Sequence, residues 1–156
     1  MDATEATTRS LRIARAGAED ADRIAPLFDA YRQFYKQQPN LPAARAFISE
    51  RLICGESVIF LALLDDVPVG FVQLYPCFSS TAMKRMWILN DLFVAPEARR
   101  HSVGEALMER SRQWAIETKA DSLWLETAVD NYPAQRLYER QGWKRDDHYY
   151  RYLMPL

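Results

Sequence analysis

Residues 87–108, WILNDLFVAPEARRHSVGEALM, place an apolar strand, a turn at Ala95-Pro96, a basic loop and a helix in direct succession. The first backbone N–H groups of a helix have no intrahelical partner, so together with the helix dipole they attract anions. Arg99 and Arg100 add positive charge beside those groups, and Gly104 permits close approach of a ligand. The stretch therefore predicts a pyrophosphate-binding site at the start of this helix.

The same stretch belongs to a strand–loop–helix–strand unit, because another apolar strand is predicted over residues 122–128. Two strands joined by such a helix are expected to be parallel, with a right-handed crossover. Ligands collect at the carboxyl ends of central parallel strands in sheets of this kind. The unit thus predicts an α/β fold and the edge of the sheet at which its site lies.

The rest of the chain adds elements on either side of this unit. Alternating apolar residues and β-branched residues predict strands over 11–15, 57–64, 67–78 and 84–94, with a hairpin turn at Asp65-Asp66. Helical spacing predicts a core-facing stripe from Ile24 to Tyr35, a helix from Pro42 to Cys54, and a short helix from Asn131 to Gly142. An aromatic last strand is predicted around 148–154, with a short strand at 143–145. The predicted fold class is a mixed α/β sheet covered by helices.

Composition limits the classes of protein to which this chain can belong. With 156 residues, 49% of them hydrophobic, it has the usual size of one domain, expected over 1–156 with a disordered leader at 1–9. A net charge of −1 argues against nucleic acid or an anionic membrane as the main partner. The acidic start lacks a secretory signal and no apolar stretch approaches the roughly 20 residues of a membrane span, so a cytoplasmic protein is expected. Cys54 and Cys77 show no metal-site or disulfide spacing, so we expect reduced structural thiols and no metal.

The basic loop also carries a resemblance to a known family. Arg99-Arg100-His101-Ser102-Val103-Gly104 is similar to the Gln/Arg-x-x-Gly-x-Gly/Ala loop of the GNAT superfamily of N-acetyltransferases, except that Ser102 stands at the first glycine position. The resemblance extends over roughly residues 85–145, through Asp91-Leu92-Phe93-Val94, Asn131 and Leu137–Trp143. It implies a central, mostly antiparallel sheet in which one parallel strand pair splays apart, with helices on both faces.

The resemblance implies acetyl-CoA as the acetyl donor and assigns residues to it. Its pantetheine arm would take backbone hydrogen bonds from Leu92, Phe93 and Val94, and the same arm would contact Asn131 and Ala134. Tyr138 would protonate the departing thiolate as the general acid. The pyrophosphate would bind Arg99, Arg100, His101, Ser102, Val103, Gly104 and Glu105.

The implied reaction is direct attack of a neutral primary amine on the thioester carbonyl, without a covalent enzyme intermediate. The amine would belong to a small molecule or a peptide, and a homodimer is expected. Polyamine acetyltransferases of this superfamily usually carry a glutamate where this chain has Asn90, which weakens a polyamine assignment. The general base is therefore open among Asp91, Glu126 and Asp130, each acting through water, and Asp91 is our candidate.

Other interpretations of the same residues stay open. Ser102 and Asn90 also fit an acyl-CoA-binding or regulatory module that has lost its chemistry. Without the resemblance, Tyr138 is more typical of a core aromatic and Asn131 of a helix N-cap. Acceptor specificity is expected in residues 31–41. The C-terminal aromatic residues would line an acceptor pocket, pack in the core or form a subunit contact: His148, Tyr149, Tyr150 and Tyr152.

Overall fold

The structure is a computed structural model that describes residues 9–156, so nearly all of the predicted leader lies outside the described residues. The chain divides into two compact units, Met1–Leu125 and Glu126–Leu156. The second unit contains one helix, α4 (Tyr132–Arg140). The first unit contains β1 (Leu11–Arg15), α1 (Ala21–Phe34), α2 (Leu41–Ile53), β2 (Val58–Leu64), β3 (Val67–Ser79), β4 (Lys84–Val94), α3 (Val103–Glu117) and β5 (Ser122–Trp124), with short 3-10 helices at Ala18–Asp20 and Pro96–Ala98.

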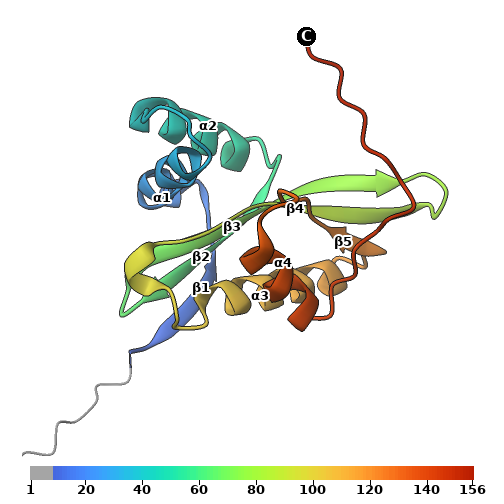
Figure 1. Ribbon diagram of the computed structural model, residues 1–156. Coiled ribbons are helices and arrows are strands. Elements are labelled where there is room, and N and C mark those ends of the chain that lie inside the picture. The colour runs from blue at the N-terminus through green and yellow to red at the C-terminus, as the bar shows by residue number, and fades with distance from the viewer. Residues whose placement is uncertain (1–8) are drawn as a thin grey trace, which may run out of the picture. The chain divides into compact units, whose positions relative to one another are not determined.

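The first unit is built on one mixed sheet with the strand order β1-β2-β3-β4-β5. Neighbouring strands are antiparallel from β1 to β4, whereas β4 and β5 are parallel. Helices α1 and α2 lie against one face of this sheet and α3 lies against the other (Figure 1). The predicted fold class and the predicted parallel strand pair are therefore confirmed.

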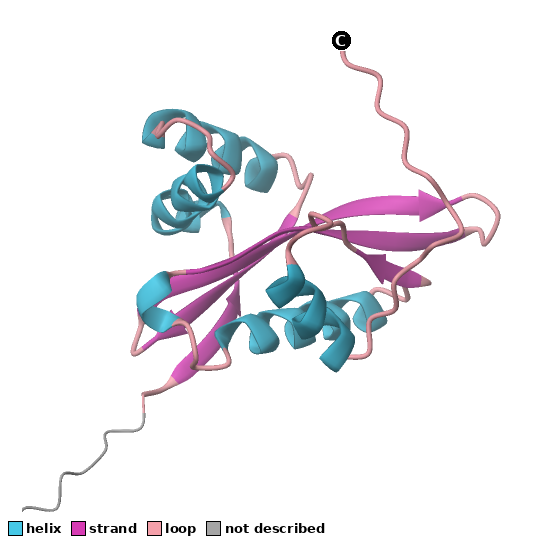
Figure 2. Cartoon of the chain, viewed as in Figure 1, coloured by secondary structure: helices cyan, strands magenta, loops and turns pink. Residues whose placement is uncertain are grey.

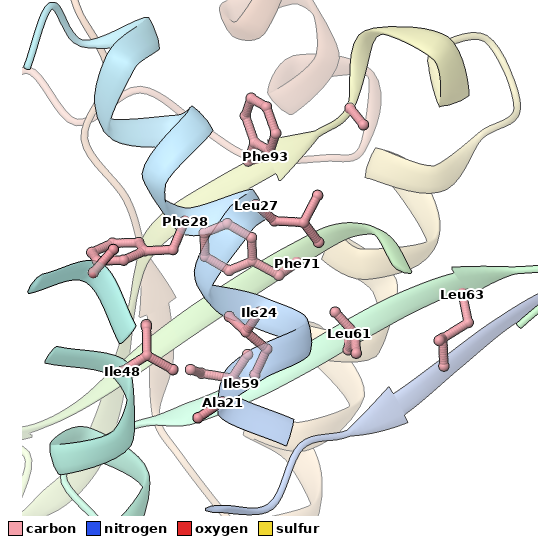
Figure 3. Packing of buried hydrophobic residues seen from close by; sticks show 12 residues of the cluster. Ala21, Ile24, Leu27, Phe28, Ile48, Ile59, Leu61, Leu63, Phe71 and Phe93 are labelled. Atoms are coloured by element: carbon pink, nitrogen blue, oxygen red, sulfur yellow. The ribbon is translucent and has the colours of Figure 1, made fainter. Parts of the chain in front are cut away.

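Strand β2 shows why both faces of the sheet need a helical cover. All seven of its residues, VIFLALL, are buried. Ile59, Leu61 and Leu63 belong to the core cluster formed with α1 and α2 (Figure 3). On the opposite face, the ring centroids of Phe60 and Trp114 of α3 lie 6.0 Å apart. A strand that reads as a continuous apolar run is stable in such a position because neither face meets water.

Most predicted boundaries agree with the structure to within a residue or two. The side chain of Asn40 caps α2 by accepting a hydrogen bond from the backbone N–H of Ala43 at 3.1 Å, which moves the predicted start from Pro42 to Leu41. Asp65 and Asp66 connect β2 and β3, and both have positive φ, 50° and 63°. Two positive φ angles are typical of the hairpin turn whose twist matches that of the strands, so the predicted hairpin is confirmed.

Three predictions are wrong: those for β5, for the strands near the C-terminus and for the aromatic stripe of α1. Strand β5 ends at Trp124 rather than at residue 128, and it lies at the edge of the sheet rather than at its centre. In the described chain, residues 141–156 contain neither helix nor strand, so the predicted strands at 143–145 and 148–154 are not formed (Figure 2). Aromatic residues favour strands only where a partner strand and a packing surface exist, and Tyr149, Tyr150 and Tyr152 are all exposed.

The third error concerns the aromatic stripe of α1. Phe34 and Tyr35 were expected to face the core with Ile24 and Phe28, but both are more than half exposed. Phe34 is the last residue of α1 and Tyr35 is its C-cap, so neither lies within the buried turns of the helix. Their rings instead pack edge to face on each other, with centroids 5.3 Å apart.

Candidate functional site

Strand β4 contains a β-bulge in which Asn90 is the extra residue. Gln73 of β3 pairs with Asp91, while the next residue, Leu74, pairs with Leu89, so Asn90 has no partner on β3. One inserted residue reverses the face of the sheet to which all later side chains point.

The reversal is visible in two side chains of β4 that are an even number of positions apart. Trp87 donates a hydrogen bond from its Nε1 to Oγ1 of Thr118, 2.8 Å away, just beyond the end of α3. Phe93, in contrast, belongs to the core cluster of α1 and α2 on the other face. In a regular strand both would point the same way. The bulge therefore turns Asp91 toward α1.

Asp91 is buried, with 3% of its surface exposed, and it accepts hydrogen bonds from several side chains. Nε2 of Gln73 lies 2.5 Å from its Oδ2, and Nδ2 of Asn90 lies 2.9 Å from its Oδ1. The Tyr31 hydroxyl of α1 donates to the backbone carbonyl of Asn90 at 3.4 Å and interacts with the carboxyl of Asp91. Ser57 extends the network, since its Oγ donates to Oε1 of Gln73 at 2.8 Å. We call Tyr31, Ser57, Gln73, Asn90 and Asp91 the Asp91 cluster.

Burial dominates the electrostatics of the Asp91 cluster. It raises the pKa of Asp91, and the hydrogen bonds from Gln73 and Asn90, together with the interaction with Tyr31, oppose that rise only in part. Burial and the Asp91 charge together raise the pKa of Tyr31 and bring that of Tyr75 to about 12. Among the ion pairs of residues 9–156, none includes Asp91. A carboxylate in this environment binds a proton more readily than an exposed aspartate does, as a general base requires.

Strand β5 ends just before β4 reaches the bulge. The pairing of β4 with β5 ends at Ile88 and Trp124, so within residues 9–156 no strand pairs with Leu92–Val94 on that side of β4. Backbone groups along this edge are therefore open to a ligand that can replace a strand. The Val94 carbonyl is an exception, because it already accepts a hydrogen bond from Nε of Arg99 at 3.2 Å.

Residues 99–105, here the 99–105 segment, connect this edge to α3 through an unusual backbone. Arg100 and Ser102 have φ of 71° and 55°, in the left-handed region. Ser102 is the N-cap of α3, yet in the described structure its side chain makes no capping hydrogen bond, and its carbonyl accepts from the N–H of Ala106 at 3.0 Å. The first N–H groups of α3 thus donate neither to an intrahelical carbonyl nor to the side chain of Ser102. Such a helix start can bind an anion.

The same geometry explains why glycines belong in this loop. A left-handed conformation costs an L residue about 1 kcal/mol, a cost that glycine does not have. Ser102 adopts this conformation at the position where the loop pattern has glycine. Gly104 is different, because a Cβ added there would meet its nearest neighbour, Cγ2 of Val94, only at 3.8 Å. No steric demand of the protein itself requires glycine at position 104.

Five predicted site residues lie in the second unit: Glu126, Asp130, Asn131, Ala134 and Tyr138. Oδ1 of Asn131 accepts a hydrogen bond from the backbone N–H of Ala134 at 3.4 Å, which confirms Asn131 as the N-cap of α4. Tyr138 of the same helix packs near Trp143, with ring centroids 6.2 Å apart. Glu126 forms an ion pair with Arg151. The contributions of Asn131, Ala134 and Tyr138 to acetyl-CoA binding stay predictions.

Sequence reasoning found Asp91 but missed the residues that hold it. Gln73 had a usable signal, because it is the one polar residue in the apolar run Phe71-Val72-Gln73-Leu74-Tyr75. A buried polar side chain needs a hydrogen-bonding partner. Nothing local marked Ser57 as that partner, since its contact with Gln73 depends on the pairing of β2 with β3.

Metal binding and membrane insertion find no support in the same residues. Among residues 9–156, no group of three or more His, Cys, Asp or Glu side chains is placed to hold a metal ion. No helix in that range combines the length and the apolar character that crossing a membrane requires. Cys54 and Cys77 are both free thiols, as expected.

Comparisons with known proteins agree with this geometry. Residues 21–143 match the acetyltransferase (GNAT) family. An uncharacterized N-acetyltransferase of Bacillus subtilis (strain 168), YhfO, is 43% identical over 144 residues, which make up 92% of this chain and 97% of the relative. The crystal structure of a probable acetyltransferase has a TM-score of 0.89 at 46% identity, covering 93% of this chain and 97% of that one. The aminoglycoside N-acetyltransferase AAC(6')-Iy, in complex with CoA, shares the fold, with a TM-score of 0.79 at 18% identity over 97% and 99% of the two chains.

Proposed function

We propose, from the premise that this chain belongs to the acetyltransferase (GNAT) family, that it transfers the acetyl group of acetyl-CoA to a primary amine. The chain is an acetyltransferase. The observation that carries the rest is the 99–105 segment, an uncapped helix start that follows the end of β4, where β4 has no partner on the β5 side. The acceptor is the amine of a small molecule or a peptide.

The donor fits the chemistry of the residues around that helix start. The N–H groups at the start of α3 and the charges of Arg99 and Arg100 suit the pyrophosphate of acetyl-CoA. The pantetheine arm carries amides, which suit the backbone of Leu92–Val94 where β5 no longer pairs. The thioester then lies along the strand that bears Asp91. The early end of β5 at Trp124 is what makes this arrangement available.

The reaction needs one proton removed and one proton supplied. The acceptor nitrogen bonds to the thioester carbonyl carbon, and the carbon–sulfur bond breaks with its electron pair on sulfur. Asp91 receives the proton that the amine loses, through water or the Tyr31 hydroxyl, because Asp91 itself is buried. Tyr138 supplies a proton to the thiolate, a role that rests on the family resemblance.

The proposal is tested by thiol release from acetyl-CoA over a panel of primary amines. The wild-type protein is expected to release CoA with at least one amine. Tyr138→Phe is expected to lower kcat by about 100-fold, as for the loss of a general acid, with little change in the KM for acetyl-CoA. If no amine raises CoA release above that in buffer, and Tyr138→Phe behaves like the wild type, the proposal fails.

A second candidate is a protein that binds acyl-CoA without transferring the acyl group. Two observations favour it. Ser102 holds the left-handed position where the loop pattern has glycine, and the bulge of β4 presents the amide of Asn90 rather than a carboxylate. Acetyl-CoA binding in a calorimeter, with no acetyl transfer to any amine of the panel, would favour this candidate.

Three further expectations stay predictions that the fold does not test. They are one domain over residues 1–156, a homodimer, and a cytoplasmic location. The match of the family to residues 21–143, which reach into both compact units, supports the first of these.

A further inference from the structure

Three buried polar side chains form a row across neighbouring strands of the sheet. Ser57 lies just before β2, Gln73 on β3 and Asp91 on β4, with 7%, 0% and 3% of their surfaces exposed. The Ser57 hydroxyl is 2.8 Å from Oε1 of Gln73, and Nε2 of Gln73 is 2.5 Å from Oδ2 of Asp91. A row of buried polar groups is costly unless every member is hydrogen-bonded. Its position on the strand that carries the candidate base suggests a task beyond packing.

The direction of the hydrogen bonds follows from chemistry. An ionised carboxylate only accepts, so the amide nitrogen of Gln73 must face Asp91. The amide oxygen then faces Ser57, which has a hydroxyl hydrogen to donate. Without that hydroxyl, the buried amide oxygen would lack this donor, and a rotated amide would present its oxygen to Asp91 instead. Such a rotation would favour the protonated form of Asp91. By donating to the amide oxygen, Ser57 thus stabilises the orientation in which Gln73 offers its N–H to Asp91.

We propose that Ser57 and Gln73 are positioning residues that keep the Asp91 carboxylate ionised and able to accept the proton released during acetyl transfer. The inference rests on the proposed function and deepens it. Burial favours the protonated form of Asp91, and the Gln73 hydrogen bond is the largest effect that opposes it. Neither residue needs to touch the substrate, because both act through Asp91.

Other ionisable groups also influence this position. Tyr31 of α1 interacts with Asp91, and Tyr35, just beyond the end of α1, interacts with Tyr31. Tyr75 of β3 interacts with the Asp91 charge and also with Arg51 of α2 and Glu56. Substitutions at Ser57 and Gln73 leave all five of these groups in place. A change in the titration of Asp91 in those variants therefore reports on the serine–glutamine pair.

The experiment follows the 13C carboxyl signal of Asp91 by NMR during a pH titration of the full chain, identified by its loss in Asp91→Asn. Gln73→Met removes the donor at similar side-chain volume and is expected to move the midpoint upward by about one pH unit, the worth of a hydrogen bond to a charged group. Ser57→Ala is expected to move it upward by less. Ser57→Thr, which keeps the hydroxyl, is expected to restore the wild-type midpoint.

Ser111→Ala is the matched control. Ser111 is fully buried, and its hydroxyl donates to the Leu107 carbonyl at 2.8 Å within α3. The Ser111→Ala variant therefore loses a comparable buried hydrogen bond away from Asp91, and the midpoint of its Asp91 titration should stay unchanged. If Gln73→Met does not fold, the pair Ser57→Ala and Ser57→Thr decides the question.

The outcomes separate this inference from the proposed function. Midpoints in Ser57→Ala and Gln73→Met that coincide with the wild type would overturn the inference and leave acetyl transfer untouched. If the midpoints move and the acidic limb of kcat/KM for acetyl transfer moves with them, the inference holds in full. If the midpoints move while that limb stays fixed, Ser57 and Gln73 control Asp91, but Asp91 is not the base and the proposed role of the pair in catalysis is wrong.

Discussion

The end of strand β4 borders two regions that differ in how they are built. The Asp91 cluster consists of side chains that are largely buried and hydrogen-bonded to one another. The 99–105 segment is largely exposed, and its important groups are backbone N–H groups held by left-handed residues. The first arrangement suits proton transfer and the second suits anion binding. Substitutions in one region should therefore change the catalytic rate, and those in the other should change the affinity for the donor.

The largest expected effect lies in the Asp91 cluster. Asp91→Asn removes the proposed proton acceptor while keeping the size of the side chain, so we expect kcat to fall by about 100- to 10,000-fold. The affinity for acetyl-CoA, measured by calorimetry, should stay within a factor of two or so of the wild type, since the 99–105 segment is intact. A variant with normal kcat would exclude Asp91 as the base.

The matching change in the 99–105 segment is Gly104→Ala. The added methyl group meets no protein atom closer than 3.8 Å, and alanine favours a helix over glycine by about 1 kcal/mol, so thermal stability should not fall. The affinity for acetyl-CoA should nevertheless fall about tenfold, because the methyl group keeps the pyrophosphate from the backbone. Calorimetry and thermal unfolding measure the two effects.

Gly70→Ala provides the contrast for this experiment. A Cβ at Gly70 would lie 2.8 Å from the backbone oxygen of Phe93, so this glycine is required by the fold itself. Gly70→Ala should lower the melting temperature, whereas Gly104→Ala should not. Unchanged donor affinity in Gly104→Ala would contradict the role of the 99–105 segment.

The raised pKa of Asp91 also predicts how stability depends on pH. The native state holds the Asp91 proton more tightly than the unfolded chain does. The contribution of Asp91 to the free energy of unfolding is therefore fully present below its ordinary pKa of 3.8 and is lost as the pH rises through its native pKa. We expect denaturant unfolding to show that the free energy of unfolding of the wild type falls relative to that of Asp91→Asn as the pH rises from 3.8 through the native pKa of Asp91. A difference that is independent of pH would mean that burial leaves this carboxyl unperturbed.

The smallest expected effect is at Ser102. Ser102→Gly relieves the left-handed conformation and removes a side chain beside the helix start, so acetyl-CoA should bind more tightly, by about threefold to fivefold. Calorimetric titration measures the change. Unchanged or weaker binding would count against placing Ser102 at the first glycine of the loop pattern.

The sequence predicted those features that depend on neighbours along the chain. The strand that ends at Val94, the helix that begins at Val103 and the cap at Asn131 follow from local apolar spacing and capping chemistry. The left-handed backbone at Ser102 could be suspected because the loop pattern has glycine there.

Features that depend on strand pairing could not be predicted in the same way. The bulge at Asn90 exists only as a mismatch between β3 and β4, and it alone turns Asp91 toward α1. The bond between Ser57 and Gln73 likewise needs the register of β2 on β3. The predicted strand at 148–154 failed for the opposite reason, since its tyrosines have strand propensity but no partner strand in the described chain.

The most direct test of the account is one acetyl-CoA saturation curve, measured by thiol release with a reactive amine, for the wild type, Asp91→Asn and Gly104→Ala. The account predicts that Asp91→Asn lowers kcat and leaves the KM for acetyl-CoA nearly unchanged, whereas Gly104→Ala raises that KM and leaves kcat nearly unchanged. If both variants change the same constant, or if neither changes any, the division between a buried catalytic cluster and an exposed donor-binding segment is contradicted.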